Sequence, residues 1–150
     1  MDAREYLETV RAAQRGIDRR LAVIQSMQAR EQVRAQRYDA VGKGAHGTDF
    51  MRSTGDRIDY ERRSGAELSE LRHEVERGRE LCAGVRSANP GKRWGDVLEL
   101  RYCEDRTLQE IAGTLGVSVR SVHSDMSSAL DWVDMVGIAT ARAGVGRAAI

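Results

Sequence analysis

The sequence predicts an all-α fold, in which a long N-terminal helical hairpin precedes a small domain of short helices. Long stretches consist of Ala, Arg, Glu, Gln and Leu, which lose little side-chain freedom in a helix. Aromatic residues make up only 5% of the chain and β-branched residues are scattered, so no segment has the composition of a strand. Because Pro90 is the single proline, helices can run uninterrupted over most of the length.

The first predicted helix covers roughly residues 2–38. Its apolar residues are separated by three, four or seven positions, a spacing that places them in one stripe on a helix. Glutamines stand where the series lapses, at positions 14 and 28. The stripe consists of Leu7, Val10, Ile17, Leu21 and Ile24.

The second predicted helix covers residues 57–87 and carries a stripe with the same spacing. Between the two helices the periodicity disappears, and residues 41–47 contain glycine at positions 42, 44 and 47. We therefore expect a flexible loop over about residues 40–55. The second stripe consists of Leu68, Leu71, Val75, Gly78, Cys82 and Val85.

Two striped helices joined by a loop predict an antiparallel hairpin of coiled-coil type over residues 1–88. Each stripe is narrow, so we expect a second copy of the chain, in a homodimer through the N-terminal helices, or another protein to cover it. The alternative is a hairpin that acts as a self-contained spacer.

A turn separates the hairpin from a second predicted domain, residues 92–136. Asn89, Pro90 and Gly91 stand in succession there, a combination that ends a helix. We expect Trp94 and Trp132 to lie in the core of this domain rather than to stack on bases. Residues 137–150 are expected to form a flexible tail.

The second domain contains the features of a helix-turn-helix. Thr107 is placed to cap one helix, with Glu110 completing a capping box. Gly116 supplies the left-handed backbone that ends that helix, and Ser118 caps the next. The small Ala112 leaves room for the two helices to cross. The second helix then carries an inner stripe of Val122, Met126, Ala129, Leu130 and Val133.

These residues carry a resemblance to a known family. The segment from Leu98 through Ser118, with Val122, Ala129 and Leu130, resembles region four of bacterial sigma factors, which reads promoters. The whole arrangement also resembles ArpU-type phage and prophage regulators, in which a helical region precedes such a domain. The resemblance implies a phage- or prophage-encoded activator of late genes that binds double-stranded DNA, acts with RNA polymerase and works in the bacterial cytoplasm.

The candidate DNA-binding residues are the two helix caps and the start of the second helix. Arg120 is suited to grip guanine in the major groove, and the polar side chains after it can donate to bases or phosphates. The exposed amides that follow each cap suit phosphates. The candidates are Thr107, Ser118, Arg120, Ser121, His123 and Ser124.

Two features weigh against strong DNA binding. Residues 119–125 contain one arginine, whereas the sigma-factor helix is rich in arginine, and Asp125 replaces an apolar residue whose place we expect Met126 to fill. From Pro90 onward, seven basic residues face eight acidic ones, a balance of −1. A single module should therefore bind DNA modestly and need a second copy or RNA polymerase.

Two alternative functions remain open. In one, the helix-turn-helix no longer reads DNA and serves as a protein-docking adaptor on the transcription machinery. In the other, the protein is a phage DNA-packaging adaptor.

Other classes of protein are not expected. No apolar run approaches the roughly 18–20 residues that span a bilayer, and residues 1–5 lack the apolar stretch of a secretory signal, so we expect a cytoplasmic protein. Cys82 and Cys103 are predicted to be reduced, packed thiols. The cysteines and the three histidines have no metal-ligand spacing. Without a phosphate loop, a nucleophile motif or paired carboxylates, we expect neither a cofactor nor an enzyme.

Overall fold

The all-α prediction is confirmed. A computed structural model describes residues 1–41 and 47–145, with side chains outside residues 38–50, and this part of the chain contains no strand. The long helices come first and the short ones follow, as predicted. They are α1 (Ala3–Val41), α2 (Gly47–Ala88), α3 (Trp94–Leu98), the π-helix η1 (Glu99–Cys103), α4 (Leu108–Leu115), α5 (Val119–Val136) and α6 (Ile138–Arg142).

The long helices extend further than predicted. A loop over about residues 40–55 is wrong at both ends, because α1 runs to Val41 and α2 begins at Gly47; the remaining part, residues 42–46, lies outside the described residues. Backbone hydrogen bonds form along a helix whether or not apolar side chains recur at every third or fourth position. An interior glycine lowers the stability of a helix by only about 1 kcal/mol. The absence of an apolar periodicity in this segment therefore does not mean that the helix has ended.

The chain divides into two compact units. One contains residues 1–15 together with those from 72 onward, and the other contains residues 16–71. The first unit thus includes the predicted 92–136 domain and, in addition, one end of each long helix.

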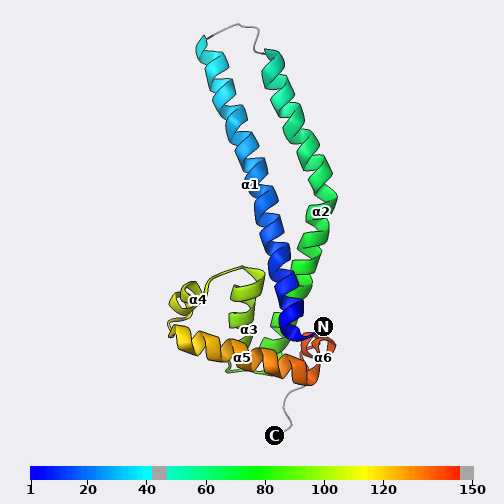
Figure 1. Cartoon of the computed structure of the whole chain (residues 1–150), viewed down its shortest axis with the longest axis vertical. Helices are drawn as coiled ribbons and strands as arrows, with labels where there is room; N and C mark the ends of the chain where they lie inside the picture. Colours follow the sequence, from blue (N-terminus) through cyan, green and yellow to red (C-terminus); the bar gives the residue numbers. More distant parts are fainter. Residues whose placement is uncertain (42–46, 146–150) are drawn as a thin grey trace. The chain divides into compact units, whose positions relative to one another are not determined.

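The first unit has a continuous apolar core. Leu7 and Val10 of α1 and Leu81 and Val85 of α2 have no exposed area, and Ile111 of α4 and Val122 of α5 are equally buried. Figure 1 shows α3 and α4 lying against α5. Full burial of such a side chain stabilises the fold by about 1.5–3 kcal/mol. The fifteen N-terminal residues are therefore part of the folding unit that contains the helix-turn-helix. The other fully buried large side chains are Val97, Leu98, Tyr102, Val133, Cys82 and Cys103.

The helical segment over residues 94–103 consists of two parts. After α3 the chain continues as η1, where the Glu104 amide donates to the Glu99 carbonyl, five residues back, at 3.1 Å. Tyr102 and Cys103 at its end are 1% and 0% exposed. Both cysteines are buried and free, as predicted.

The expected flexible tail is wrong over its first residues. After Gly137, whose φ is 91°, the chain forms α6, and Ala141 has no exposed area. A Cβ at Gly84 of α2 would collide with the carbonyl oxygen of Ala141 and lie 2.8 Å from that of Arg142. This glycine is what lets α6 pack directly on α2. Residues 146–150 lie outside the described residues.

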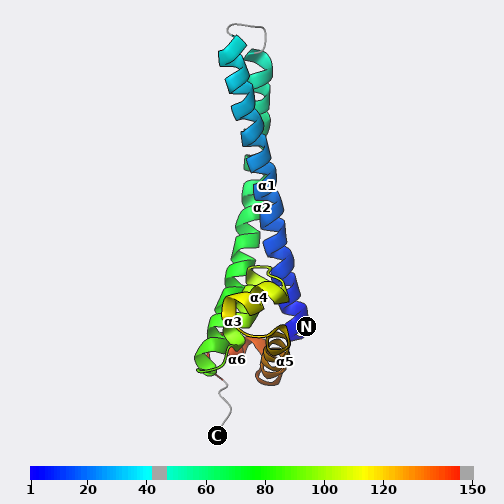
Figure 2. The same cartoon turned by 90° about the vertical axis from the view of Figure 1, so that its left-hand side faces the viewer.

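The second unit consists of the paired segments of α1 and α2. They run alongside one another in Figure 1 and overlap in the turned view of Figure 2, and ion pairs join them from Arg20 to Glu67 (2.8 Å) and from Arg57 to Glu31 (2.9 Å). The two helices also pack tightly at Gly16, where an added Cβ would lie 3.2 Å from Leu71. The antiparallel hairpin is therefore present in the described residues.

Replacement of Gly84 by alanine tests the packing of α6. We expect Gly84→Ala to lower the free energy of unfolding by about 1–3 kcal/mol, because its methyl group meets backbone atoms that cannot rotate away. Gly113→Ala is the matched control, because Gly113 is exposed in α4 with open space around its Cα. This change should raise the free energy of unfolding by about 0.5–1 kcal/mol. Urea unfolding of both variants measures the difference, and equal stabilities would contradict the close contact.

Candidate nucleic-acid interface

The turn between α4 and α5 has the predicted helix-turn-helix geometry. The Thr107 hydroxyl accepts from the Glu110 amide at 3.2 Å and so caps α4. Gly116 ends α4 with φ 67°, and the Val117 amide donates to the Ala112 carbonyl at 3.1 Å. Ser118 then starts α5. Thr107, Gly116 and Ser118 each perform the backbone task predicted for them.

The inner faces of α4 and α5 also follow the prediction. Ala112 is 6% exposed at the crossing of the helices. Met126 is 6% exposed and accepts from the Tyr102 hydroxyl through its sulfur at 3.8 Å, so it fills the inner position that Asp125 vacates. All five predicted stripe residues of α5 are buried.

Three candidate DNA-binding residues lie exposed on the first turns of α5. Arg120, His123 and Ser124 are all exposed, and Arg120 forms no ion pair with any described residue. The guanidinium of Arg120 is therefore available to an anionic or polar partner outside this unit.

The remaining candidates are occupied by capping. The Ser118 hydroxyl accepts from the Ser121 amide at 3.1 Å and donates to the Ser121 hydroxyl at 2.9 Å. Ser121 is half-buried. Ser118 and Ser121 thus form the N-terminal cap of α5, and Thr107 lies on the other helix, at the start of α4. Five of the six candidates thus lie at the start of α5, namely Ser118, Arg120, Ser121, His123 and Ser124. Thr107 is separate from them, because it caps α4.

Arg93 is a site residue that the sequence analysis missed. Its Nε donates to Oδ2 of Asp125 at 2.8 Å, which joins the start of α3 to the middle of α5. The Asp125 side chain is 20% exposed and that of Arg93 is 47% exposed. An acidic side chain on α5 is thereby neutralised beside the exposed polar residues. The two residues are 32 positions apart, and no periodicity connects them.

Asp105, which precedes α4, makes a second contact that the sequence did not indicate. It has φ 53°, a left-handed conformation that is uncommon outside glycine. Its two carboxylate oxygens accept from Nε of Arg11 at 2.6 Å and Nε of Arg15 at 2.9 Å. Burial by itself raises the pKa of the Asp105 carboxyl, but the hydrogen bonds from Arg15 and Arg11 outweigh it and hold this pKa below its ordinary value. The first residues of α1 therefore fix the connection that leads into α4.

The far end of α5 is also attached to α1. The Ala3 amide, in the first turn of α1, donates to Oδ1 of Asp134 at 2.7 Å, an anion at a helix N-terminus. From α6, the Arg142 guanidinium donates to the Tyr6 hydroxyl at 2.7 Å and lies 5.4 Å from the centre of its ring. Both ends of the α4–α5 pair are thus held by the N-terminal residues of the chain.

The two tryptophans differ in burial. Trp132 is 6% exposed and lies in the core, as predicted. Trp94 is only half-buried, and the Lys92 ammonium lies 5.5 Å from the centre of its ring. Its position at the first turn of α3, next to the turn at Pro90, leaves one side of the ring outside the core.

Comparison with known proteins identifies this part of the chain. Residues 93–132, which comprise α3, η1, α4 and most of α5, match the family model of Sigma-70, region 4. They form a sigma-70 region 4 helix-turn-helix domain. No curated protein and no solved structure matches the chain.

The sigma-70 region 4 domain is a DNA-binding domain, so residues 93–132 have the character of a unit that binds DNA, as in a regulator. The match covers about a quarter of the chain, so α1 and α2 lie wholly outside it. Among the described helices, none combines the length and apolar character required to cross a membrane. The described side chains include no cluster of three or more His, Cys, Asp or Glu residues suited to a metal ion.

Replacement of Asp105 by asparagine tests the contact with α1. Asparagine tolerates the same left-handed backbone, so Asp105→Asn removes the charge without adding strain. We expect a loss of about 1–2 kcal/mol of stability at pH 7, between the values for exposed and buried pairs.

The pH dependence provides the control for this variant. Folding lowers the pKa of the Asp105 carboxyl. The ion pair therefore contributes fully to stability above the ordinary pKa of about 3.9, and this contribution disappears as pH falls through the lowered pKa. Chemical unfolding between pH 7 and pH 3 should show the gap between wild type and variant closing below about pH 4. A gap that is constant over this range would contradict a stabilising ion pair.

Proposed function

We propose that this protein is a sequence-specific, DNA-binding transcriptional regulator whose recognition helix is α5. The observation that carries the proposal is the combination of a sigma-70 region 4 domain over residues 93–132 with exposed polar side chains on the first turns of α5. Those side chains are Arg120, His123 and Ser124. In a helix-turn-helix this is the surface that enters the major groove.

Each part of this surface has a separate task. Arg120 reads guanine through its O6 and N7, while His123 and Ser124 donate to neighbouring bases or phosphates. The first amides of α4 and α5, beyond the caps at Thr107 and Ser118, bind phosphates, since helix N-termini carry unpaired donors and a positive partial charge. The base contacts supply specificity, and the phosphate contacts set the register on the duplex.

The small number of positive charges determines how the protein works. A balance of −1 from Pro90 onward implies that one domain neutralises few phosphates, so its affinity is modest at physiological salt. We propose that a second copy joined through the hairpin, or RNA polymerase, supplies the rest. The resemblance to ArpU-type regulators supports a phage or prophage origin, action on late genes and a place in the bacterial cytoplasm.

The ion pair between Arg93 and Asp125 supports DNA reading. An unpaired carboxylate on α5 would repel the phosphates of the DNA backbone, and Arg93 removes that charge at 2.8 Å. Asp125, which stands where sigma factors have an apolar residue, is thus compatible with a DNA duplex bound against α5.

A docking role is the second candidate function. The exposed acidic residues Glu104, Glu110, Asp131 and Asp134 lie on the first unit and favour a basic protein surface over DNA. In that case the domain is an adaptor on the transcription machinery, or in a phage DNA-packaging complex. Its association with a protein would weaken with salt while binding to DNA remained undetectable.

Selection from random duplex DNA tests the proposed function. The full chain should enrich a defined motif at low salt, and Arg120→Ala should blur one position of that motif and reduce affinity by about 1–3 kcal/mol. Arg77→Ala is the control, because Arg77 is an exposed arginine of α2 outside the domain. The absence of any enriched motif with folded wild-type protein would overturn DNA reading and leave the docking role.

Removal of the Arg93–Asp125 pair tests its electrostatic role. Arg93→Ala leaves Asp125 unpaired beside the DNA surface, and we expect DNA binding at low salt to weaken about two- to fivefold. The double variant Arg93→Ala with Asp125→Asn should recover most of this loss, as measured by fluorescence anisotropy over a salt series. If the double variant stays as weak as the single one, Arg93 acts on DNA directly and neutralisation is the wrong explanation.

A further inference from the structure

The second unit buries few side chains of its own. Among its described residues, Ile17, Ser64 and Leu68 are the only side chains classed as buried, whereas Val23 is 39% and Ile58 42% exposed. A single pair of helices cannot enclose an apolar stripe, because each helix has one neighbour only. The hairpin therefore presents apolar surface that a further element can cover.

One face of this hairpin contains a continuous groove. Two adjoining hollows of about 560 and 590 Å³ share Arg63 as a lining residue. Apolar side chains from both helices line the groove, namely Val23 and Met27 of α1 and Tyr60 of α2.

The two ends of the groove carry opposite charge. At the end nearer residue 16, Arg19 lines the groove beside Arg20, and only Arg20 is paired with a carboxylate, that of Glu67 at 2.8 Å. At the other end stand Asp56 and Asp59 of α2 together with Arg62, while Arg63 is shared by both hollows; neither aspartate forms an ion pair with a described residue.

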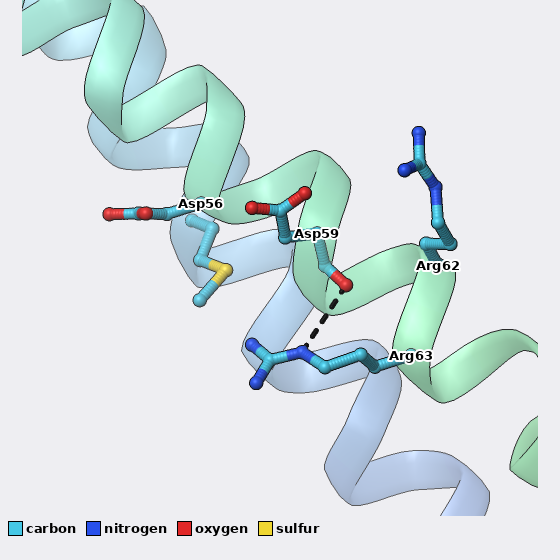
Figure 3. A pocket seen from close by; sticks show the side chains of 5 residues that line it. Asp56, Asp59, Arg62 and Arg63 are labelled. Carbon is cyan, nitrogen blue, oxygen red and sulfur yellow. Dashed lines mark hydrogen bonds between the residues drawn. The ribbon is translucent and has the colours of Figure 1, made fainter.

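A close view shows how these carboxylates are left available. In Figure 3, Asp56 and Asp59 project from successive turns of α2, and Arg62 points away from Arg63. The Arg63 guanidinium donates through Nε to the backbone carbonyl of Asp59 at 3.4 Å, not to its carboxylate. The carboxylates thus keep their full acceptor capacity.

We infer that a second copy of this chain occupies the groove in an antiparallel orientation. A two-fold axis across the groove places Arg19 of each copy opposite Asp56 and Asp59 of the other, and it covers the apolar lining of both. A parallel arrangement would bring Arg19 against Arg19 and the aspartates against aspartates, which is repulsive. The charge distribution therefore selects both the partner and its direction.

The pairing deepens the proposed function. The dimer raises DNA affinity because two joined domains bind two DNA sites at once, and this part of the inference rests on the proposed function. The association itself depends only on residues 16–71 and is measurable without DNA, so the two proposals can fail separately.

Charge reversal in the full-length chain tests the inference. Sedimentation equilibrium at low salt should show wild type as a dimer. Arg19→Glu and the double variant Asp56→Lys with Asp59→Lys should each weaken self-association at least tenfold, because each places like charges opposite one another. Arg77→Glu is the control, an equal reversal on α2 outside residues 16–71 that should leave the dimer unchanged.

Mixing the variants separates repulsion from misfolding. The Arg19→Glu chain and the Asp56→Lys, Asp59→Lys chain carry complementary ends, so a mixture should form a heterodimer of near wild-type affinity. A wild type that stays monomeric at all concentrations would overturn the inference while leaving DNA reading intact. Wild-type-like dimers of both variants, or no heterodimer in the mixture, would equally overturn it.

Discussion

The burial of the first turns of α1 within the compact unit that contains the helix-turn-helix is the constraint on which that unit depends. Leu7 and Val10 are completely enclosed, although they stand about a hundred residues before α5 in the chain. Around them, Asp105 binds two arginines of α1 and Asp134 receives the amide of Ala3. A domain of about forty residues has little core of its own, so the added helix ends supply surface that it would otherwise leave exposed.

This arrangement links α5 to the start of the chain. Asp105 precedes α4 and Asp134 lies near the end of α5, so both sides of the helix pair are held by the same segment of α1. A displacement of that segment would change the support of α5. The hairpin is in this sense part of the DNA-binding unit at its ends, in addition to whatever it binds along residues 16–71.

Polar contacts satisfy several of the acidic and capping groups at the start of α5. Arg93 neutralises Asp125, and the Ser118 and Ser121 hydroxyls complete the cap of α5, so the acidic and capping groups of the helix are satisfied internally. Arg120 is left as the cation on the first turns. In the proposed function, such a surface favours selectivity through a few contacts, supplemented by a second binding surface, over strong attraction to any duplex.

The sequence by itself determined the features that depend on neighbours three or four positions apart. These are the helical stripes, the caps at Thr107 and Ser118, the left-handed Gly116 and the resulting helix-turn-helix, because each is a local backbone or packing requirement. Only the tertiary structure decided which distant residues meet. Asp105 finds its arginines 94 and 90 positions away, and α6 packs on Gly84 where a flexible tail was expected. Such contacts follow from the direction of whole helices in space, which leaves no periodic trace in the sequence.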